Sequence, residues 1–158
     1  MLRIAFVCHG NICRSPMAEY IFKKMVSDAG LDGKISVSSF ATSTDEIWGD
    51  IGNPVYPNAA HELSKRGIDC SDKHAVLLKR SDYDKFDLFI GMDRYNISNM
   101  TRLFLGDPKG KVSRLLSYAS IEKDISDPWY TRRFDIAAGE VETGCKALLD
   151  YIKKQYFA

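Results

Sequence analysis

The chain has 158 residues, of which 45% are hydrophobic and 27% charged, a composition expected of one compact domain spanning residues 1–158. Twenty-two Lys and Arg against 21 Asp and Glu leave a net charge of +1, so net charge gives no basis for a nucleic-acid partner. The apolar run at residues 1–7 is too short for a signal peptide or a membrane span, and we expect a cytoplasmic monomer without a membrane partner.

Hydrophobic periodicity predicts strands and helices that alternate along the chain. Residues 2–7 form an apolar run typical of a buried strand, which turn-forming residues end at 8–11. Pro16 then marks the start of a helix that stops before Gly30. Further strands are expected over 35–38, 86–91 and 112–118, and further helices over 58–66, 92–103 and 134–156. Residues 48–57 contain two Gly and two Pro and are expected to form a surface loop.

This alternation is typical of an α/β fold. It predicts a single domain with a small, four-stranded, mostly parallel sheet, helices on both of its faces, and a phosphate-binding loop after the first strand.

The four cysteines, at positions 8, 13, 70 and 145, are too few for a secreted disulfide scaffold and lack the spacing of a zinc site. They indicate a reducing compartment and no metal or other cofactor. Cys8 and Cys13 are five positions apart in a glycine-bearing loop, which favours a reactive role.

The loop from Cys8 to Pro16 places a thiol and the Arg14 guanidinium six positions apart at the start of a helix. Backbone N–H groups at a helix N-terminus bind tetrahedral dianions, and Gly10 permits a tight path. Arg14 can hold two phosphate oxygens, and the same positive field favours a nucleophilic Cys8 thiolate.

Two polar residues of the same loop have expected roles. Ser15 can donate to the Cys8 sulfur, and Asn11 can fix the loop through side-chain hydrogen bonds. The alternative without function is that Cys8 is a buried cysteine at a strand end and Arg14 is a surface charge. The strand-loop-helix context favours the catalytic interpretation.

A thiolate enzyme needs a proton donor for the leaving group from elsewhere in the chain. Asp127 is the candidate, because Pro128 stiffens the adjacent backbone and two aromatic residues follow it. The Asp-Pro pair by itself is also typical of an ordinary turn.

With both segments, the sequence resembles the low-molecular-weight protein tyrosine phosphatases. The family's Cys-x-Gly-Asn-x-Cys-Arg-Ser-Pro loop matches residues 8–16, and its Asp-Pro-aromatic-aromatic loop matches residues 127–130. Residues 91–93 look like the family's strand end before a helix. The resemblance covers nearly the whole chain.

The resemblance implies that Cys8 is the nucleophile, Arg14 the phosphate clamp and Asp127 the general acid and then base. It implies a phosphotyrosine-containing protein as substrate. The residues that it implies in substrate binding are His9, Gly10, Asn11, Ile12, Cys13, Ser15, Trp48, Trp129 and Tyr130. Ser39 and His74 are implied as supports of the loop, and Cys13 as the redox partner of Cys8.

Some positions depart from the family pattern. Residues 44–51 align poorly, so Trp48 has an alternative role in packing or in an exposed loop. The order of residues 73–75 is unusual, so His74 has an alternative as a solvated or core histidine. Phe40 leaves the support of Asn11 in doubt.

Competing functions remain open. An arsenate reductase of the same fold needs further thiols to relay a disulfide, and Cys70 and Cys145 are isolated. A protein-arginine phosphatase carries a small Thr where this chain has Ile12, a residue better suited to lying against a flat ring. The non-enzyme alternatives are a silent phosphate-binding module, which would predict loss of a catalytic residue, and a thiol redox sensor that uses Cys8 and Cys13.

Overall fold

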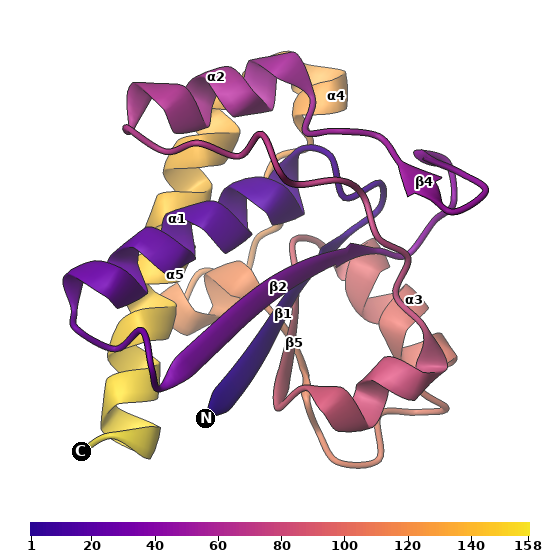
Figure 1. Cartoon of the computed structure of the whole chain (residues 1–158). Helices are drawn as coiled ribbons and strands as arrows, with labels where there is room; N and C mark the ends of the chain where they lie inside the picture. The colour runs from indigo at the N-terminus through magenta and orange to yellow at the C-terminus, as the bar shows by residue number, and fades with distance from the viewer.

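The computed structural model describes all 158 residues and has an α/β architecture (Figure 1). The strands are β1 (Leu2–Cys8), β2 (Ile35–Ala41), β3 (Ile47–Trp48), β4 (Ile51–Gly52), β5 (Leu88–Gly91) and β6 (Val112–Arg114). The α-helices are α1 (Arg14–Asp28), α2 (Pro57–Lys65), α3 (Arg94–Leu103), α4 (Pro128–Thr131) and α5 (Phe134–Tyr156). Two short 3₁₀ helices are η1 (Arg80–Lys85) and η2 (Leu115–Ala119).

Four strands form one parallel sheet in the order β2-β1-β5-β6. β1 is therefore a central strand, and its seven residues pair in register with β2 from Leu2↔Ile35 to Cys8↔Ala41. Both chain ends lie at the end of the sheet opposite to the β1–α1 loop (Figure 1). That loop consequently lies at the carboxyl edge of the sheet, where open α/β sheets bind their ligands.

The side chains of β1 alternate between two hydrophobic cores. Ile4, Phe6 and Cys8 belong to the larger cluster, which α1, α2 and α5 cover. Ala5 and Val7 belong to the smaller cluster on the other face, with residues of η1 and α3. The sheet is buried on both faces, which explains why β1 is apolar from Ile4 to Val7 without alternation.

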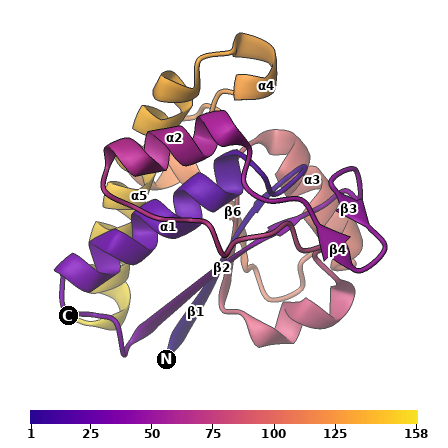
Figure 2. The same cartoon turned by 45° about the horizontal axis from the view of Figure 1, so that its top comes forward.

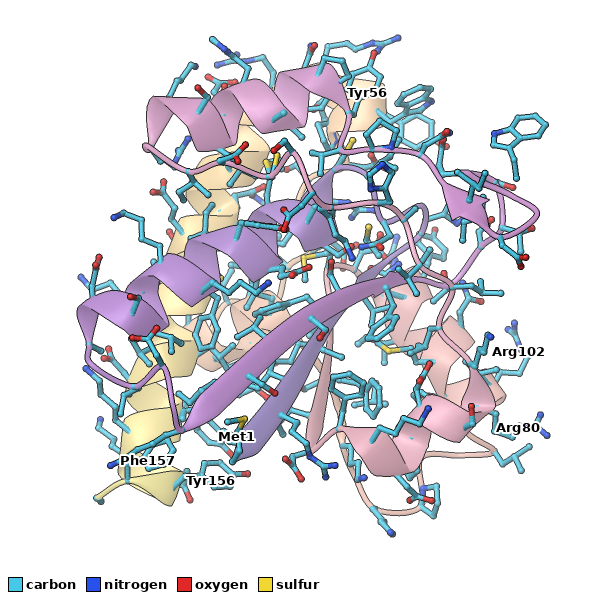
Figure 3. The ribbon with its side chains drawn as sticks, viewed as in Figure 1. Met1, Tyr56, Arg80, Arg102, Tyr156 and Phe157 are labelled. Atoms are coloured by element: carbon cyan, nitrogen blue, oxygen red, sulfur yellow. The ribbon has the colours of Figure 1, made fainter.

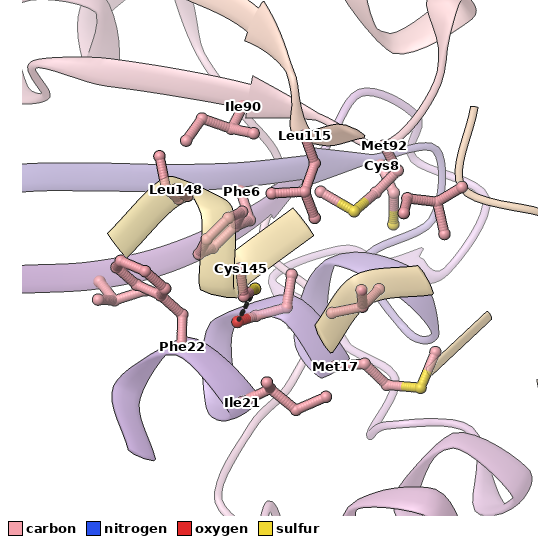
Figure 4. Packing of buried hydrophobic residues seen from close by; sticks show 14 of the residues in the cluster. Phe6, Cys8, Met17, Ile21, Phe22, Ile90, Met92, Leu115, Cys145 and Leu148 are labelled. Atoms are coloured by element: carbon pink, nitrogen blue, oxygen red, sulfur yellow. Dashed lines mark hydrogen bonds between the residues drawn. The ribbon is translucent and has the colours of Figure 1, made fainter. Parts of the chain in front are cut away.

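The larger core is closely packed around α1 and α5 (Figure 4). Phe6 meets Phe22 edge-on with ring centroids 5.6 Å apart, and the Cys145 thiol donates to the carbonyl of Ala18 at 3.8 Å. Burial raises the pKa of Cys145. Cys145 therefore serves as a packed core residue with a protonated thiol.

The predicted fold class is confirmed, with differences at several element ends. The strand expected over 35–38 continues to Ala41, and the last strand ends at Arg114, where η2 takes over. The strand expected over 86–91 begins at Leu88. The helix expected from Met92 begins at Arg94, since Asp93 is its N-cap.

The expectation of an irregular loop over 48–57 was incomplete. Part of this stretch is a two-stranded antiparallel hairpin of β3 and β4, and Pro57 begins α2. The hairpin is anchored at Gly52, where a Cβ atom would lie only 1.9 Å from the carbonyl oxygen of Ala75. No helix in the fold combines the length and the apolar character needed to cross a membrane.

Candidate active site

The loop between β1 and α1 brings Cys8 and Arg14 to the carboxyl edge of the sheet. Cys8 is the last residue of β1, and Arg14 is the first residue of α1. Both side chains are nearly inaccessible, with residue exposures of 3% and 4%. We call residues 8–16 the phosphate loop.

The tight path of this loop depends on Asn11 more than on Gly10. Asn11 has a φ of 58°, a left-handed conformation that asparagine tolerates better than most residues. Gly10 has an ordinary φ, but a Cβ atom there would lie 3.2 Å from Cγ of Glu46. Gly10 therefore contributes to the tight path by leaving room for the Glu46 side chain and not by a left-handed conformation.

Hydrogen-bond donors surround the Cys8 sulfur. The Ser15 hydroxyl lies 3.0 Å from Sγ, and the backbone N–H of Asn11 donates to Sγ at 3.3 Å. The Asn11 side-chain amide donates to Ser15 Oγ at 2.8 Å, which leaves the Ser15 proton free to point at the sulfur. Both donors can stabilise negative charge that develops on the sulfur.

A buried polar network continues below the loop. The Asn11 amide also donates to Ser39 Oγ at 2.9 Å, and the Ser39 hydroxyl donates to Glu19 Oε1 at 2.6 Å. Lys73 donates to the carbonyl of Ser39 at 2.9 Å and lies 3.6 Å from the Glu19 carboxylate. The Val76 N–H donates to Asn11 Oδ1 at 3.0 Å, so every polar atom of the Asn11 side chain is satisfied.

Ser39 thus lies where loop support was expected, but His74 does not. The His74 side chain is exposed and makes no hydrogen bond, and only its backbone pairs, with Pro54. Its neighbours Lys73 and Val76 reach the network in its place. The physical reason is the extended backbone here, which turns alternate side chains to solvent.

Arg14 is held along one edge of its guanidinium. Nη1 donates to Asp93 Oδ2 at 2.8 Å and to the carbonyl of Ile125 at 3.1 Å, which uses both of its protons. Nε and Nη2 make no hydrogen bond. This free edge has the geometry that binds two oxygens of a phosphate side by side.

Asp127 lies beside this clamp. Its Oδ2 is 3.5 Å from Arg14 Nη2, and its Oδ1 accepts the Trp129 N–H at 3.0 Å as the N-cap of α4. Burial acts to lower the pKa of Arg14, but the Cys8 thiolate and the two nearby carboxylates outweigh burial and raise it. The site thus joins a sulfur, a permanent cation and a partly exposed carboxyl group.

The phosphate loop also offers backbone donors for an anion. The N–H groups of Gly10, Ile12, Cys13, Arg14 and Ser15 make no hydrogen bond within the protein. They precede or begin α1, whose dipole is positive at this end. No three His, Cys, Asp or Glu side chains lie close enough together to hold a metal ion.

Cys13 is buried and unpaired, as are the other cysteines. Burial raises the pKa of the Cys13 thiol to about 12, and the charge of Cys8 adds to the shift. Cys13 is therefore protonated at neutral pH and is no competitor to Cys8 as a nucleophile. The disulfide between them stays a prediction.

We call the residues around the opening of the phosphate loop the rim, and aromatic residues form one side of it. The Trp129 ring meets Tyr56 edge-on at 5.5 Å, and Tyr56 stacks on Phe134 at 5.7 Å. Tyr56 lies next to α4 (Figure 3). Tyr130 and Trp48 contact no other aromatic ring and are 82% and 74% exposed. The expected wall is thus built at Trp129, and two of its predicted members project into solvent.

A second part of the rim joins the phosphate loop to the hairpin. His9 Nε2 lies 2.7 Å from Asp45 Oδ2, and this contact lowers the pKa of Asp45. Asn53 donates to Glu46 at 2.7 Å within the same segment. The segment that carries Trp48 is therefore tied to the phosphate loop by the exposed contact between His9 and Asp45.

Sequence reasoning missed three members of the site. Asp93, Glu19 and Tyr56 were not predicted, although Asp93 and Asn96 form the capping-box pattern that marks a helix start. No sequence signal connects Asp93 to Arg14, which lies 79 positions away. Glu19 reads as an exposed helix residue until the fold buries it.

Comparison with known proteins agrees with this geometry. A family model described as "Low molecular weight phosphotyrosine protein phosphatase" matches residues 3–157. The chain belongs to this family. It is 37% identical over 157 residues to the low molecular weight protein-tyrosine-phosphatase YfkJ of Bacillus subtilis, with 98% of each chain covered. It is 34% identical to PtpA of Staphylococcus haemolyticus, with 98% of this chain and 96% of the relative covered.

Solved structures give the same family fold. The crystal structure of YfkJ from Bacillus subtilis superposes with a TM-score of 0.91 at 35% identity and covers 99% of this chain and 97% of its own. A structure of the arginine phosphatase YwlE superposes with a TM-score of 0.84 at 25% identity and covers 99% of both chains. Solved structures similar to this chain therefore include a protein whose name states a different phosphoryl substrate.

Proposed function

We propose that this chain is a protein tyrosine phosphatase that hydrolyses phosphotyrosine in proteins through a phosphocysteine at Cys8. One observation carries the proposal. The free edge of Arg14, the unpaired N–H groups of the phosphate loop and the Cys8 sulfur meet at one place, with Asp127 3.5 Å from the clamp. This arrangement supplies a nucleophile, an anion site and a proton donor.

In the first step, the Cys8 thiolate attacks phosphorus, the S–P bond forms and the bond from phosphorus to the phenolic oxygen breaks. Arg14 and the loop N–H groups hold the three equatorial oxygens as charge develops on them. The Asp127 carboxyl gives its proton to the leaving phenolate oxygen.

In the second step, water attacks the phosphocysteine and Asp127 takes its proton. The S–P bond breaks, and the electron pair returns to the Cys8 sulfur. The Ser15 hydroxyl and the Asn11 N–H, at 3.0 and 3.3 Å from that sulfur, stabilise it as a leaving group. Inorganic phosphate then leaves the loop.

Two features of the chain support an aryl substrate. The loop carries the branched apolar Ile12, whose side chain is buried, in place of a small Thr. Trp129 with Tyr56 provides an aromatic wall, from which a flat ring gains contact area. The similarity to the arginine phosphatase YwlE makes phosphoarginine the competing substrate.

The test is hydrolysis of an aryl phosphate and of phosphotyrosine, phosphoserine and phosphoarginine peptides by wild type and Cys8→Ser, with reductant and without metal. We expect release from the aryl substrates alone and no turnover by Cys8→Ser. A preference for phosphoarginine would mean that phosphotyrosine is not the substrate, but it would leave the proposed mechanism through Cys8 unchanged. Undiminished turnover by Cys8→Ser would refute the nucleophile.

A further inference from the structure

A hollow of about 430 Å³ lies next to the Asp127 loop, where α2 and the start of α5 come together. Figures 1 and 2 both show α2 and α4 side by side at this end of the molecule. The hollow is lined by Asn58, His61, Glu62, Lys65, Arg132, Phe134 and Asp135. Six of the seven are polar or charged, which suits a hydrophilic ligand.

The carboxylates of the hollow already have cationic partners. Glu62 pairs with Lys65 at 2.8 Å and with Arg66 at 3.3 Å. Asp135 accepts two hydrogen bonds from Arg133, at 3.1 and 3.0 Å, which lower its pKa to about 2. Neither carboxylate is therefore left to attract a further cation.

Arg132 is the lining cation without a carboxylate. Its guanidinium makes no ion pair and no hydrogen bond, and the residue is exposed. His61 is also exposed, and its ring has no hydrogen-bond partner. Once the ion pairs are accounted for, the positive charge of Arg132 remains, and it favours binding of an anion in the hollow.

The backbone holds Arg132 in an unusual conformation. As the C-cap of α4 it has a φ of 61°, where glycine is favoured and a side chain costs free energy. Its guanidinium lies 5.5 Å from the centre of the Trp129 ring. Strain of this kind at a non-glycine residue commonly accompanies a functional constraint.

Arg132 is connected to the predicted substrate wall as well. Trp129 contacts Tyr56, and Tyr56 stacks on Phe134, which itself lines the hollow. The hollow and the aromatic wall therefore share one set of side chains. A peptide whose phosphotyrosine ring lies against Trp129 passes close to Arg132.

We propose that this hollow is a second substrate subsite, in which Arg132 binds the carboxylate of an Asp or Glu close in sequence to the phosphotyrosine. The inference rests on the proposed phosphatase function and specifies its substrate class as acidic phosphotyrosine segments. His61 and Asn58 supply hydrogen bonds at the edge of the subsite. Arg132 is a specificity residue and takes no part in the bond changes at Cys8.

The experiment uses phosphotyrosine peptides in which a single Glu is moved from four positions before the phosphotyrosine to four positions after it, against an all-Ala reference. We expect one or two adjacent positions to raise kcat/KM by about 3- to 10-fold at low salt. The preference should fall as ionic strength rises, because the carboxylate and Arg132 meet at the surface.

Two variants test the assignment to Arg132. Arg132→Gln removes the charge, and Arg132→Gly removes the side chain while relieving the left-handed conformation. Both should lower the Glu-to-Ala ratio to about 1. Arg132→Gly should unfold at the same or a higher temperature than wild type, so its loss of preference would not come from unfolding.

The matched control is Arg102→Gln. Arg102 is an exposed arginine of α3 whose side chain hydrogen-bonds only to Asn99, and it lies far from α2 and α4 (Figure 3). This variant has the same net charge as Arg132→Gln and should keep the wild-type ratio.

An equal effect of Arg102→Gln, or a preference spread over every Glu position, would mean that the overall field acts and would overturn the subsite. Cys8-dependent turnover with the same kcat/KM for all peptides would also overturn the subsite. The proposed phosphatase function would stand in that case. Absence of turnover on every phosphotyrosine peptide would overturn both.

Discussion

The floor and the rim of the site are built differently. On the floor, Cys8, Asn11 and Arg14 are buried, and the Asn11 side chain has a partner for each of its polar atoms. On the rim, Trp48 and Tyr130 are mostly exposed and contact no other ring. The part that we propose to perform the chemistry is fixed before substrate arrives, whereas the part that meets the protein substrate is open.

Physical chemistry explains the difference. Burying a polar group is costly unless it is hydrogen-bonded, so a buried floor can exist only as a completed network. An exposed aromatic ring gains contact energy only when a partner covers it. Substitutions on the floor should therefore act on stability and chemistry, and those on the rim should act chiefly on substrate choice.

Among substitutions that keep the Cys8 nucleophile, the largest effect is expected for Asp93→Ala. The change leaves Arg14 Nη1 without its buried carboxylate and also removes the N-cap of α3. With the clamp displaced, kcat/KM for an aryl phosphate should fall by about 10²- to 10³-fold.

Asp93→Asn is the matched control for that substitution, because it keeps a capping oxygen but loses the charge. Its kcat/KM should lie between wild type and Asp93→Ala. Activity of Asp93→Ala within threefold of wild type would break the distinction between floor and rim.

A smaller effect, on stability, is expected for Glu19→Gln. Burial lowers the pKa of Lys73, and the Glu19 carboxylate opposes this shift and balances its charge. Loss of the carboxylate leaves the Lys73 ammonium buried without an anion. The free energy of unfolding should fall by on the order of 3 kcal/mol, as measured by chemical denaturation.

Glu142→Gln is the control for Glu19. Glu142 pairs with Arg66 between α5 and α2, but its side chain is 43% exposed. Its loss should cost about 1 kcal/mol or less. Equal losses in the free energy of unfolding for the two variants would show that the buried network stabilises the fold no more than an exposed ion pair does.

The smallest effect on stability is expected for Trp48, the exposed aromatic ring of the hairpin. Trp48→Ala should change the free energy of unfolding by less than about 0.5 kcal/mol, because the ring is 74% exposed. Tyr56→Ala removes a ring packed between Trp129 and Phe134 and should cost about 2 to 3 kcal/mol. Thermal unfolding of both variants measures the contrast; a large loss for Trp48→Ala would place that ring in the core of the fold.

Much of the fold follows from the sequence because periodicity reports burial directly. The helix Phe134–Tyr156 has the predicted ends, since its apolar positions keep helical spacing throughout. β2 was predicted too short because Ser39 does not read as a strand residue. It belongs to the strand, since Ser39 and Phe40 pair with Phe6 and Val7 of β1.

The site was predictable where function is local in sequence. The phosphate loop and Asp127 are short motifs, and the structure brings them together. Asp93 and Glu19 were not predictable, because their partners, Arg14 and Lys73, lie far away along the chain. Such pairs depend on the tertiary fold, which hydrophobic periodicity does not specify at the level of single contacts.

Asp93 uses its two oxygens for different tasks. Oδ1 accepts the Asn96 N–H and caps α3, while Oδ2 accepts Arg14. Folding of α3 and positioning of the Arg14 guanidinium are consequently coupled, and we expect them to occur together. A population of molecules that has partly lost its structure should therefore contain fully active and fully inactive members, with none of intermediate efficiency. Specific activity then measures the fraction of folded chains, which makes turnover of an aryl phosphate a direct assay of protein quality in any preparation.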